Sequence, residues 1–151
     1  MTIQHTDLII EREYGSQDWQ RYNKKIWDQI YTTVPEPLLF ENFLYNYATQ
    51  ITDGQYTGGS WEIVEIKRGG FYFRPVANQK WNVTSMAYQS EHEITSDAFG
   101  LALSIIVFSN YQSSPERYSD YLTELYGNCR DLAFDDNAAH PENDIIFKLI
   151  D

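Results

Sequence analysis

Residues 56–75 read YTGGSWEIVEIKRGGFYFRP, and this stretch decides the fold of the chain. It contains two short runs rich in β-branched and aromatic residues, at 61–66 and 71–74, and a glycine pair precedes each run. Runs of this kind, bounded by Gly and Pro, predict β-strands. Because only four residues join them, the two strands are predicted to be antiparallel, since parallel strands need a long crossover.

The glycine pairs do not match a phosphate-binding loop. Such loops read Gly-x-x-x-x-Gly-Lys-Ser/Thr or Gly-x-Gly-x-x-Gly and lie between a strand and a helix N-terminus. Gly58-Gly59 precedes a strand and Gly69-Gly70 joins two strands, so neither pair opens a helix. Both pairs are therefore predicted to supply the positive φ angles that turns require.

Further elements surround this hairpin. Two more strands are predicted at 81–86 and 88–94, continuing the hairpin as a meander. Before it, apolar residues recur at three- and four-residue spacing over residues 17–30 and 38–51, which predicts two helices, and two prolines separate them.

Three helices are predicted after the strands. Residues 95–97 (Thr-Ser-Asp) provide an N-cap for a helix at 97–109, which is apolar on nearly all sides and is expected to be the most buried element. Ser-Pro-Glu at 114–116 is a start signal for the next helix, and a last short helix is predicted at 141–150.

The predicted fold class is α+β. It consists of a single domain in which a small three- to four-stranded antiparallel meander is packed by about four or five helices. Residues 1–37 are interpreted as an N-terminal helical extension of the same domain, and residues 38–151 as its main body.

Composition and charge limit the function classes. The chain has 151 residues, 42% of them hydrophobic, and a net charge of −11 from 22 acids and 11 bases. Phosphate contacts need Lys and Arg, so direct nucleic-acid binding is not expected. The acidity either keeps the protein soluble or imitates DNA toward a DNA-binding partner, and composition alone leaves both open. One cysteine, no signal peptide and no long apolar run predict a cytoplasmic protein without a membrane segment.

No catalytic, metal or cofactor site is predicted. His5, His92 and His140 are far apart in the sequence, and none lies at metal-ligand spacing. Cys129 falls on an apolar helix stripe and is interpreted as a small buried hydrophobe. Nothing near the carboxylate pair Asp135-Asp136 indicates a raised pKa. The sequence therefore predicts a protein that is not an enzyme.

Binding to another protein is the class of function that these observations leave. One face of the hairpin is predicted to pack on helices, while the other presents a mixed aromatic and charged surface. That second face is either covered by the N-terminal helices or free to bind a partner through Tyr, Trp and Arg anchors. The candidate partner-binding residues on this face and among the later acids are Trp61, Glu62, Tyr72, Arg74, Asp97, Glu116, Asp120, Glu124, Asp131, Asp135 and Asp136.

Three motifs, in order, match a known family. They are Tyr56-x-Gly58-Gly59-x-Trp61-Glu62, Gly69-Gly70-Phe71-Tyr72-Phe73-x-Pro75, and Glu93-x-x-Ser96-Asp97-Ala98-Phe99-Gly100-Leu101. With them the chain resembles the ArdB/KlcA family of antirestriction proteins over roughly residues 38–151, which makes this segment an antirestriction-like α+β domain.

The resemblance implies a small protein of a plasmid, phage or genomic island that protects incoming DNA from type I restriction without cutting or modifying DNA. It supplies no catalytic residues. The implied partner is a type I restriction-modification enzyme or an associated host protein, and the protein itself is expected to be a monomer or weak homodimer. Direct inhibition, DNA mimicry and indirect action stay open. The alternatives are a partner-binding or immunity-type module, or a small hydrolase or ligand-binding domain with a pocket near the sheet.

Overall fold

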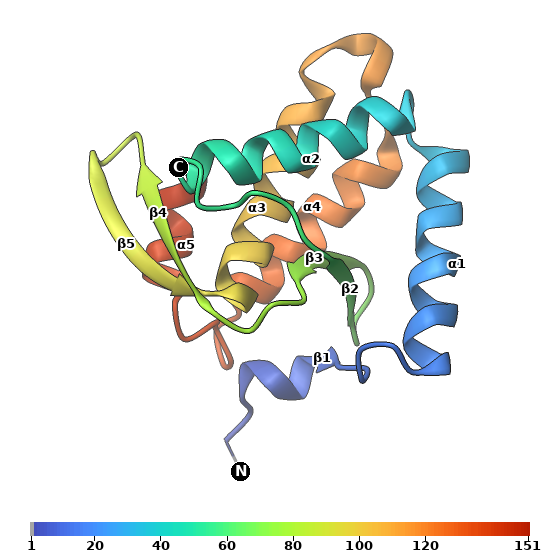
Figure 1. Ribbon diagram of the computed structural model, residues 1–151. Helices are drawn as coiled ribbons and strands as arrows, with labels where there is room; N and C mark the ends of the chain where they lie inside the picture. Colours follow the sequence, from blue (N-terminus) through green and yellow to red (C-terminus); the bar gives the residue numbers. More distant parts are fainter. Residues whose placement is uncertain (1) are drawn as a thin grey trace.

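Within residues 2–151, the strands form two separate antiparallel sheets. The computed structural model describes residues 2–151. One sheet has the order β1-β2-β3, with bounds Ile9–Ile10, Trp61–Ile66 and Phe71–Pro75. The other pairs β4 (Lys80–Ser85) with β5 (Ser90–Thr95), and it stands apart from the first sheet in Figure 1. The α+β class is confirmed, whereas the prediction of one continuous meander is wrong.

The described part of the chain, residues 2–151, contains five α-helices. They are α1 (Gln17–Thr33), α2 (Pro37–Ile51), α3 (Ser96–Asn110), α4 (Asp120–Ala133) and α5 (Asn143–Ile150). Short 3₁₀ turns lie at His5–Leu8 (η1), Tyr111–Ser113 (η2) and Pro115–Arg117 (η3). The Ser-Pro-Glu start signal thus opens η3, and α4 begins only at Asp120.

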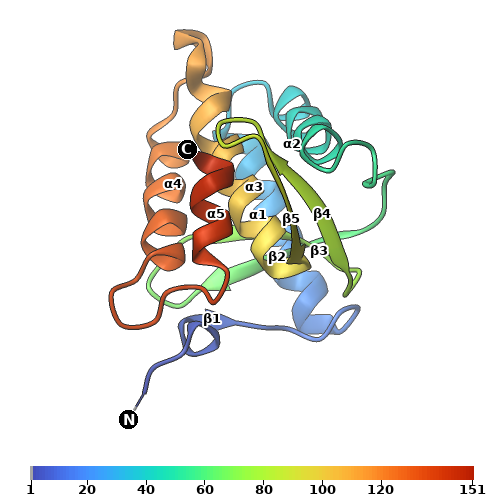
Figure 2. The ribbon, with the colours of Figure 1, turned by 90° about the vertical axis from the view of Figure 1, so that its left-hand side faces the viewer.

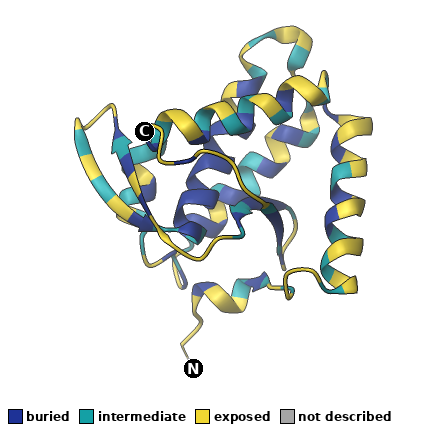
Figure 3. Cartoon of the chain, viewed as in Figure 1, coloured by how far each residue is buried: buried dark blue, intermediate teal, exposed yellow. Residues whose placement is uncertain are grey.

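Helix α3 lies at the centre of the molecule, with α4 and α5 packed beside it (Figure 2). Twelve of its 15 residues are buried, as its apolar sequence predicted, and it packs against α2, α4, α5 and β3. In Figure 3 this helix is dark blue over most of its length, while α1 carries many exposed residues. At its start, the Thr95 hydroxyl accepts a hydrogen bond from the Ala98 N–H at 3.2 Å, which confirms the predicted cap.

The outer edge of β3 is covered by helix rather than by another strand. The Phe73 N–H donates to the Ser104 hydroxyl of α3 at 2.8 Å, and Ser104 in turn donates to the Gly100 carbonyl at 2.8 Å. The Cys129 thiol of α4 lies 3.2 Å from the Phe71 carbonyl oxygen. Because side chains of α3 and α4 occupy this edge, β4 pairs with β5 instead of extending the first sheet.

The other edge of this sheet, along β2, is completed by N-terminal residues. Ile9 and Ile10 pair with Ile66 and Glu65, a strand too short for its sequence pattern to predict. Where β1 stops, the Asn23 side chain of α1 accepts a hydrogen bond from the Ile63 N–H at 2.9 Å. The division of the chain at residue 37 remains a prediction.

One face of the hairpin forms an aromatic core. The ring of Phe73 lies 5.4 Å from Trp27, 6.2 Å from Phe40 and 5.9 Å from Phe108, so α1, α2 and α3 meet on this face. At the tight turn that joins β2 to β3, Gly69 and Gly70 have φ angles of 124° and 84°, which confirms their predicted role in turns. No helix within residues 2–151 is long and apolar enough to cross a bilayer.

Candidate functional site

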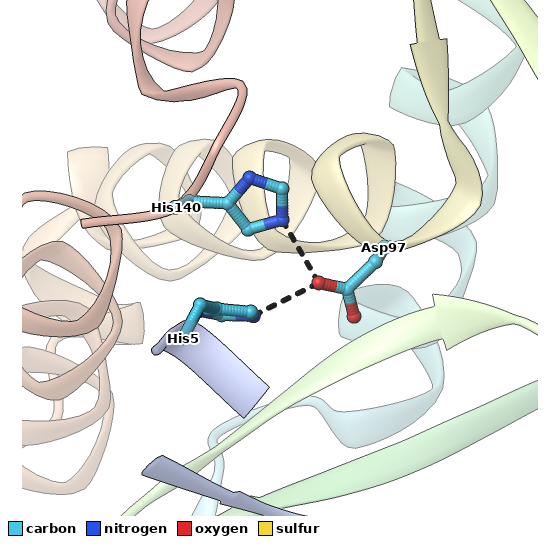
Figure 4. Close-up of side chains that lie close together, drawn as sticks. All are labelled: His5, Asp97 and His140. Carbon is cyan, nitrogen blue, oxygen red and sulfur yellow. Dashed lines mark hydrogen bonds and ion pairs between the residues drawn. The ribbon is translucent and has the colours of Figure 1, made fainter. Parts of the chain in front are cut away.

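A cluster of polar side chains on the second face of the hairpin centres on Asp97. One carboxylate oxygen, Oδ1, accepts hydrogen bonds from the Tyr72 hydroxyl at 2.6 Å and from Arg74 Nη1 at 2.9 Å. The other, Oδ2, lies 3.0 Å from His5 Nε2 and 2.9 Å from His140 Nε2 (Figure 4). We refer to Asp97, Tyr72, Arg74, His5 and His140 as the Asp97 network.

Local structure positions the acid and one of its histidines. Asp97 lies in the first turn of α3, where the positive end of the helix dipole favours a carboxylate. His140 precedes Pro141, and its Nδ1 accepts a hydrogen bond from the Glu142 N–H at 3.0 Å. An accepting Nδ1 leaves the ring proton on Nε2, so His140 donates to Asp97.

The protonation states of the network follow from burial and hydrogen bonding. Burial by itself would raise the pKa of Asp97, but the hydrogen bonds from His140, His5, Tyr72 and Arg74 outweigh it and hold the pKa well below its usual range. For Tyr72, burial and then the charge of Asp97 raise the pKa well above its ordinary value. At neutral pH, Asp97 is therefore an anion and Tyr72 a neutral donor.

Arg74 links the network to two further carboxylates. Its guanidinium lies 3.0 Å from Glu62 Oε2 and 2.7 Å from Glu11 Oε1, in addition to its contact with Asp97. The other Glu62 oxygen accepts a hydrogen bond from the Trp19 indole at 3.0 Å. Three carboxylates surround one guanidinium, so with neutral histidines these groups together carry a formal charge of −2.

A hollow lies against this network. Its volume is about 600 Å³, and its lining includes His5, Asp97 and His140 together with Glu11 and Arg74. The network is therefore not sealed within the core, and 23% of the Asp97 side chain is exposed. The arrangement offers two imidazole nitrogens and one carboxylate oxygen beside open space.

The structure brings four of the sequence-predicted residues together, although not as a docking surface. Glu62, Tyr72, Arg74 and Asp97 lie in or beside the network, but Tyr72 is fully buried and Glu62 only 9% exposed. The ring of Tyr72 is thus excluded from direct contact with a partner. Trp61 is half-buried, and its indole donates to the Tyr56 hydroxyl at 2.9 Å. These side chains are satisfied internally, and N-terminal residues cover much of this face.

The later acids occupy a different part of the surface. Glu116, Asp120, Glu124, Asp131 and Asp136 are exposed. Their neighbour, Asp135, is half-buried and forms an ion pair with Arg68 at 2.8 Å.

The sequence missed His5 and His140 as site residues. The long separation of the three histidines predicted that none would share a site, yet His5 and His140 meet at one oxygen. No local motif could have joined them, because they lie 92 and 43 positions from Asp97 along the chain. The remaining histidine, His92, lies on β5 and contacts the Ser90 hydroxyl at 2.7 Å.

Cys129 is fully buried, which confirms its interpretation as a core residue. Burial raises the pKa of its thiol. A thiol that resists ionisation is a poor nucleophile, so Cys129 is not a candidate for covalent chemistry.

The fold and its site define a small α+β protein in which a central buried helix carries an Asp-centred polar network at its N-terminus. A family model described as "Antirestriction protein" matches residues 54–151. The chain belongs to this antirestriction protein family. No curated protein matches the chain in sequence.

A solved structure shares the fold. It comes from a study of the KlcA and ArdB proteins, which are described as having a novel fold and antirestriction activity against Type I DNA restriction systems in vivo but not in vitro. The match has a TM-score of 0.66 and 17% sequence identity, and it covers 94% of this chain and 99% of that chain. At this identity, the likeness establishes the fold alone.

Proposed function

We propose that this chain protects incoming DNA from type I restriction by contacting other proteins, without cutting or modifying DNA. The observation that carries this proposal is membership of the antirestriction family over residues 54–151. The shared fold with the KlcA and ArdB proteins supports type I systems as the target. The chain would act as a monomer or weak homodimer.

The relatives' activity helps to define the partner. Antirestriction by KlcA and ArdB is described as present in vivo but not in vitro. An inhibitor that needs a further cellular component would behave in this way, because that component is absent from a purified assay. We therefore include a host protein associated with the restriction enzyme among the partners of this chain.

The spacing of the exposed acids of α4 argues against DNA mimicry. Asp120, Glu124 and Asp131 lie on one face of the helix, since steps of four and seven residues return to nearly the same direction. At about 1.5 Å per residue they span roughly 16 Å, a length over which duplex DNA carries about ten charges. The helix presents three charges where DNA of the same length presents about ten. We therefore favour individual ion pairs with a basic protein surface and not mimicry of the DNA phosphates.

The hydrolase alternative gains no support from its predicted pocket. Tyr72 is fully buried and Trp61 is half-buried with its indole bound to Tyr56, while His92 lies on β5 in contact with Ser90. These three residues therefore do not line a common pocket within residues 2–151. A non-enzymatic role remains our proposal.

Expression of the chain is expected to raise the recovery of unmodified phage plated on a host with a type I restriction system. An empty vector provides the baseline, and phage already modified for that host should plate equally with and without the chain. Equal recovery of unmodified phage in the two strains would contradict the proposed function.

A pull-down from a strain with an intact type I system tests whether the chain binds its partner through ion pairs or by DNA mimicry. We expect the chain to retain a protein partner, and we expect Asp120→Lys, Glu124→Lys and Asp131→Lys together to lose it, because these exposed acids would form the ion pairs. An excess of unmodified duplex DNA should not release the partner. Release by the duplex would instead indicate DNA mimicry, and capture by the triple variant would place the contact elsewhere.

A further inference from the structure

The Asp97 network contains three side chains of the kinds that bind transition metals. His5 Nε2, His140 Nε2 and Asp97 Oδ2 lie within 4.8 Å of one another. They come from three separate parts of the fold, namely η1, the first turn of α3 and the loop before α5, and Figure 4 shows both rings directed at the same carboxylate oxygen. Two imidazoles and one carboxylate are a common ligand set for zinc and related divalent ions.

We propose that His5, Asp97 and His140 bind a divalent transition-metal ion of the zinc type. This site goes beyond the proposed antirestriction function and does not depend on it. The sequence-based expectation of no metal site rested on spacing along the chain, whereas these three side chains are brought together only by the fold.

The two distances from the Asp97 carboxylate to the histidines require only a small adjustment. A tetrahedral zinc ion with bonds of about 2.0–2.1 Å separates its ligand atoms by about 3.3–3.4 Å. The present separations of 3.0 Å and 2.9 Å from Oδ2 to the two nitrogens are those of hydrogen bonds, in which ring protons fill the space. An ion would take the place of these protons and move Oδ2 away from each of the two nitrogens by a few tenths of an ångström.

The local charge suits a divalent cation. Asp97, Glu62 and Glu11 contribute three negative charges and Arg74 one positive charge, so the group stands at −2 while the histidines are neutral. A bound ion of charge +2 would balance these groups. Tyr72 and Arg74 both bind Asp97 through Oδ1, which leaves Oδ2 directed at the histidines.

The two histidines differ in how readily their rings can accept the ion. Coordination through Nε2 places the ring proton on Nδ1. Nδ1 of His5 is buried and has no hydrogen-bond partner among residues 2–151, so a proton placed there displaces no existing bond at Nδ1. His140 must give up the hydrogen bond from the Glu142 N–H, because Nδ1 can no longer accept it.

Three protein ligands leave the fourth position of a tetrahedral ion open. The adjoining hollow of about 600 Å³ provides room for a water molecule or another small ligand there. Binding would also connect the N-terminal segment to α3 and to the loop before α5. We therefore expect the ion to stabilise the folded chain, because it binds the folded arrangement of ligands and not the unfolded chain.

Titration calorimetry of the tag-free chain with Zn²⁺ is expected to show one ion per chain at neutral pH. His5→Gln and His140→Gln should each weaken binding by more than the roughly 10- to 100-fold that loss of a supporting residue costs. Mg²⁺ should not bind, because it prefers oxygen ligands. Affinity should fall as pH is lowered, since protons compete for both imidazoles.

His92→Gln is the matched control, because it removes a histidine of β5 outside the network. Co²⁺ gives a second measurement: its tetrahedral absorption bands should form with the wild-type chain and with His92→Gln, but not with His5→Gln. Thermal melts without metal report whether each variant folds. Absence of one-to-one Zn²⁺ binding, or unchanged affinity in folded His5→Gln, would overturn the proposal.

Discussion

Replacing Gly100 by alanine is expected to lower the free energy of unfolding by about 3 kcal/mol or more. A Cβ atom on this residue would lie 2.2 Å from the Phe73 carbonyl oxygen and 2.7 Å from the Arg74 Cα. Both are backbone atoms and cannot rotate away, so α3 would have to move off β3. That movement would also break the hydrogen bond from the Phe73 N–H to Ser104.

Gly127→Ala provides the control. This glycine also lies inside a helix, α4, but a Cβ atom there would meet nothing within 4 Å. Alanine favours helix over glycine by up to about 1 kcal/mol, so this variant should be neutral or slightly more stable. Urea unfolding of both variants measures the difference. If the two variants were equally stable, the close approach of α3 to β3 would not be what prevents a side chain at position 100.

Asp97→Asn is expected to lower the free energy of unfolding by about 2–3 kcal/mol at neutral pH. The amide is nearly the same size but removes the charge on which Tyr72, Arg74 and two histidines converge. The loss of stability should be smaller than when removal of one partner leaves a buried charge unpaired. Arg74 is not left unpaired, because it keeps Glu62 and Glu11 as partners. Asp131→Asn, on an exposed site of α4, should change little.

The effect of Asp97 should depend on pH in a defined direction. Its folded-state pKa lies well below the value of about 3.9 expected in the unfolded chain. Its contribution is therefore fully present above that value and is lost as pH falls from about 4 toward the lower folded-state pKa. Urea unfolding at pH 7 and near pH 3 should show the gap between wild type and Asp97→Asn shrinking in acid. A constant gap would contradict this assignment.

Much of the secondary structure follows from local patterns in the sequence. Alternation in Phe71-Tyr72-Phe73-Arg74 places two rings in the core and directs Tyr72 and Arg74 to the opposite face, where both bind Asp97. Three- and four-residue spacing predicts α1 and α2, and Thr95 caps α3 as expected. Such features depend on neighbouring residues, so they can be derived without knowledge of the tertiary fold.

The arrangement of the strands could not be derived in this way. Whether β4 joins β3 depends on what covers the edge of β3, and that edge is occupied by Ser104 and Cys129 from distant helices. Similarly, Ile9 and Ile10 form a strand only because β2 offers them a partner. Two residues carry too little pattern to be recognised by themselves.

By itself, the sequence determined the hairpin at residues 56–75, the buried helix that follows the strands, and the motifs that match the antirestriction family. These are properties of short segments, whose periodicity and turn residues act locally. Only the tertiary structure decided that there are two sheets, that Tyr72 is buried, and that His5 and His140 meet at Asp97. Contacts between residues 92 and 43 positions apart depend on how the whole chain packs, because no local preference specifies them.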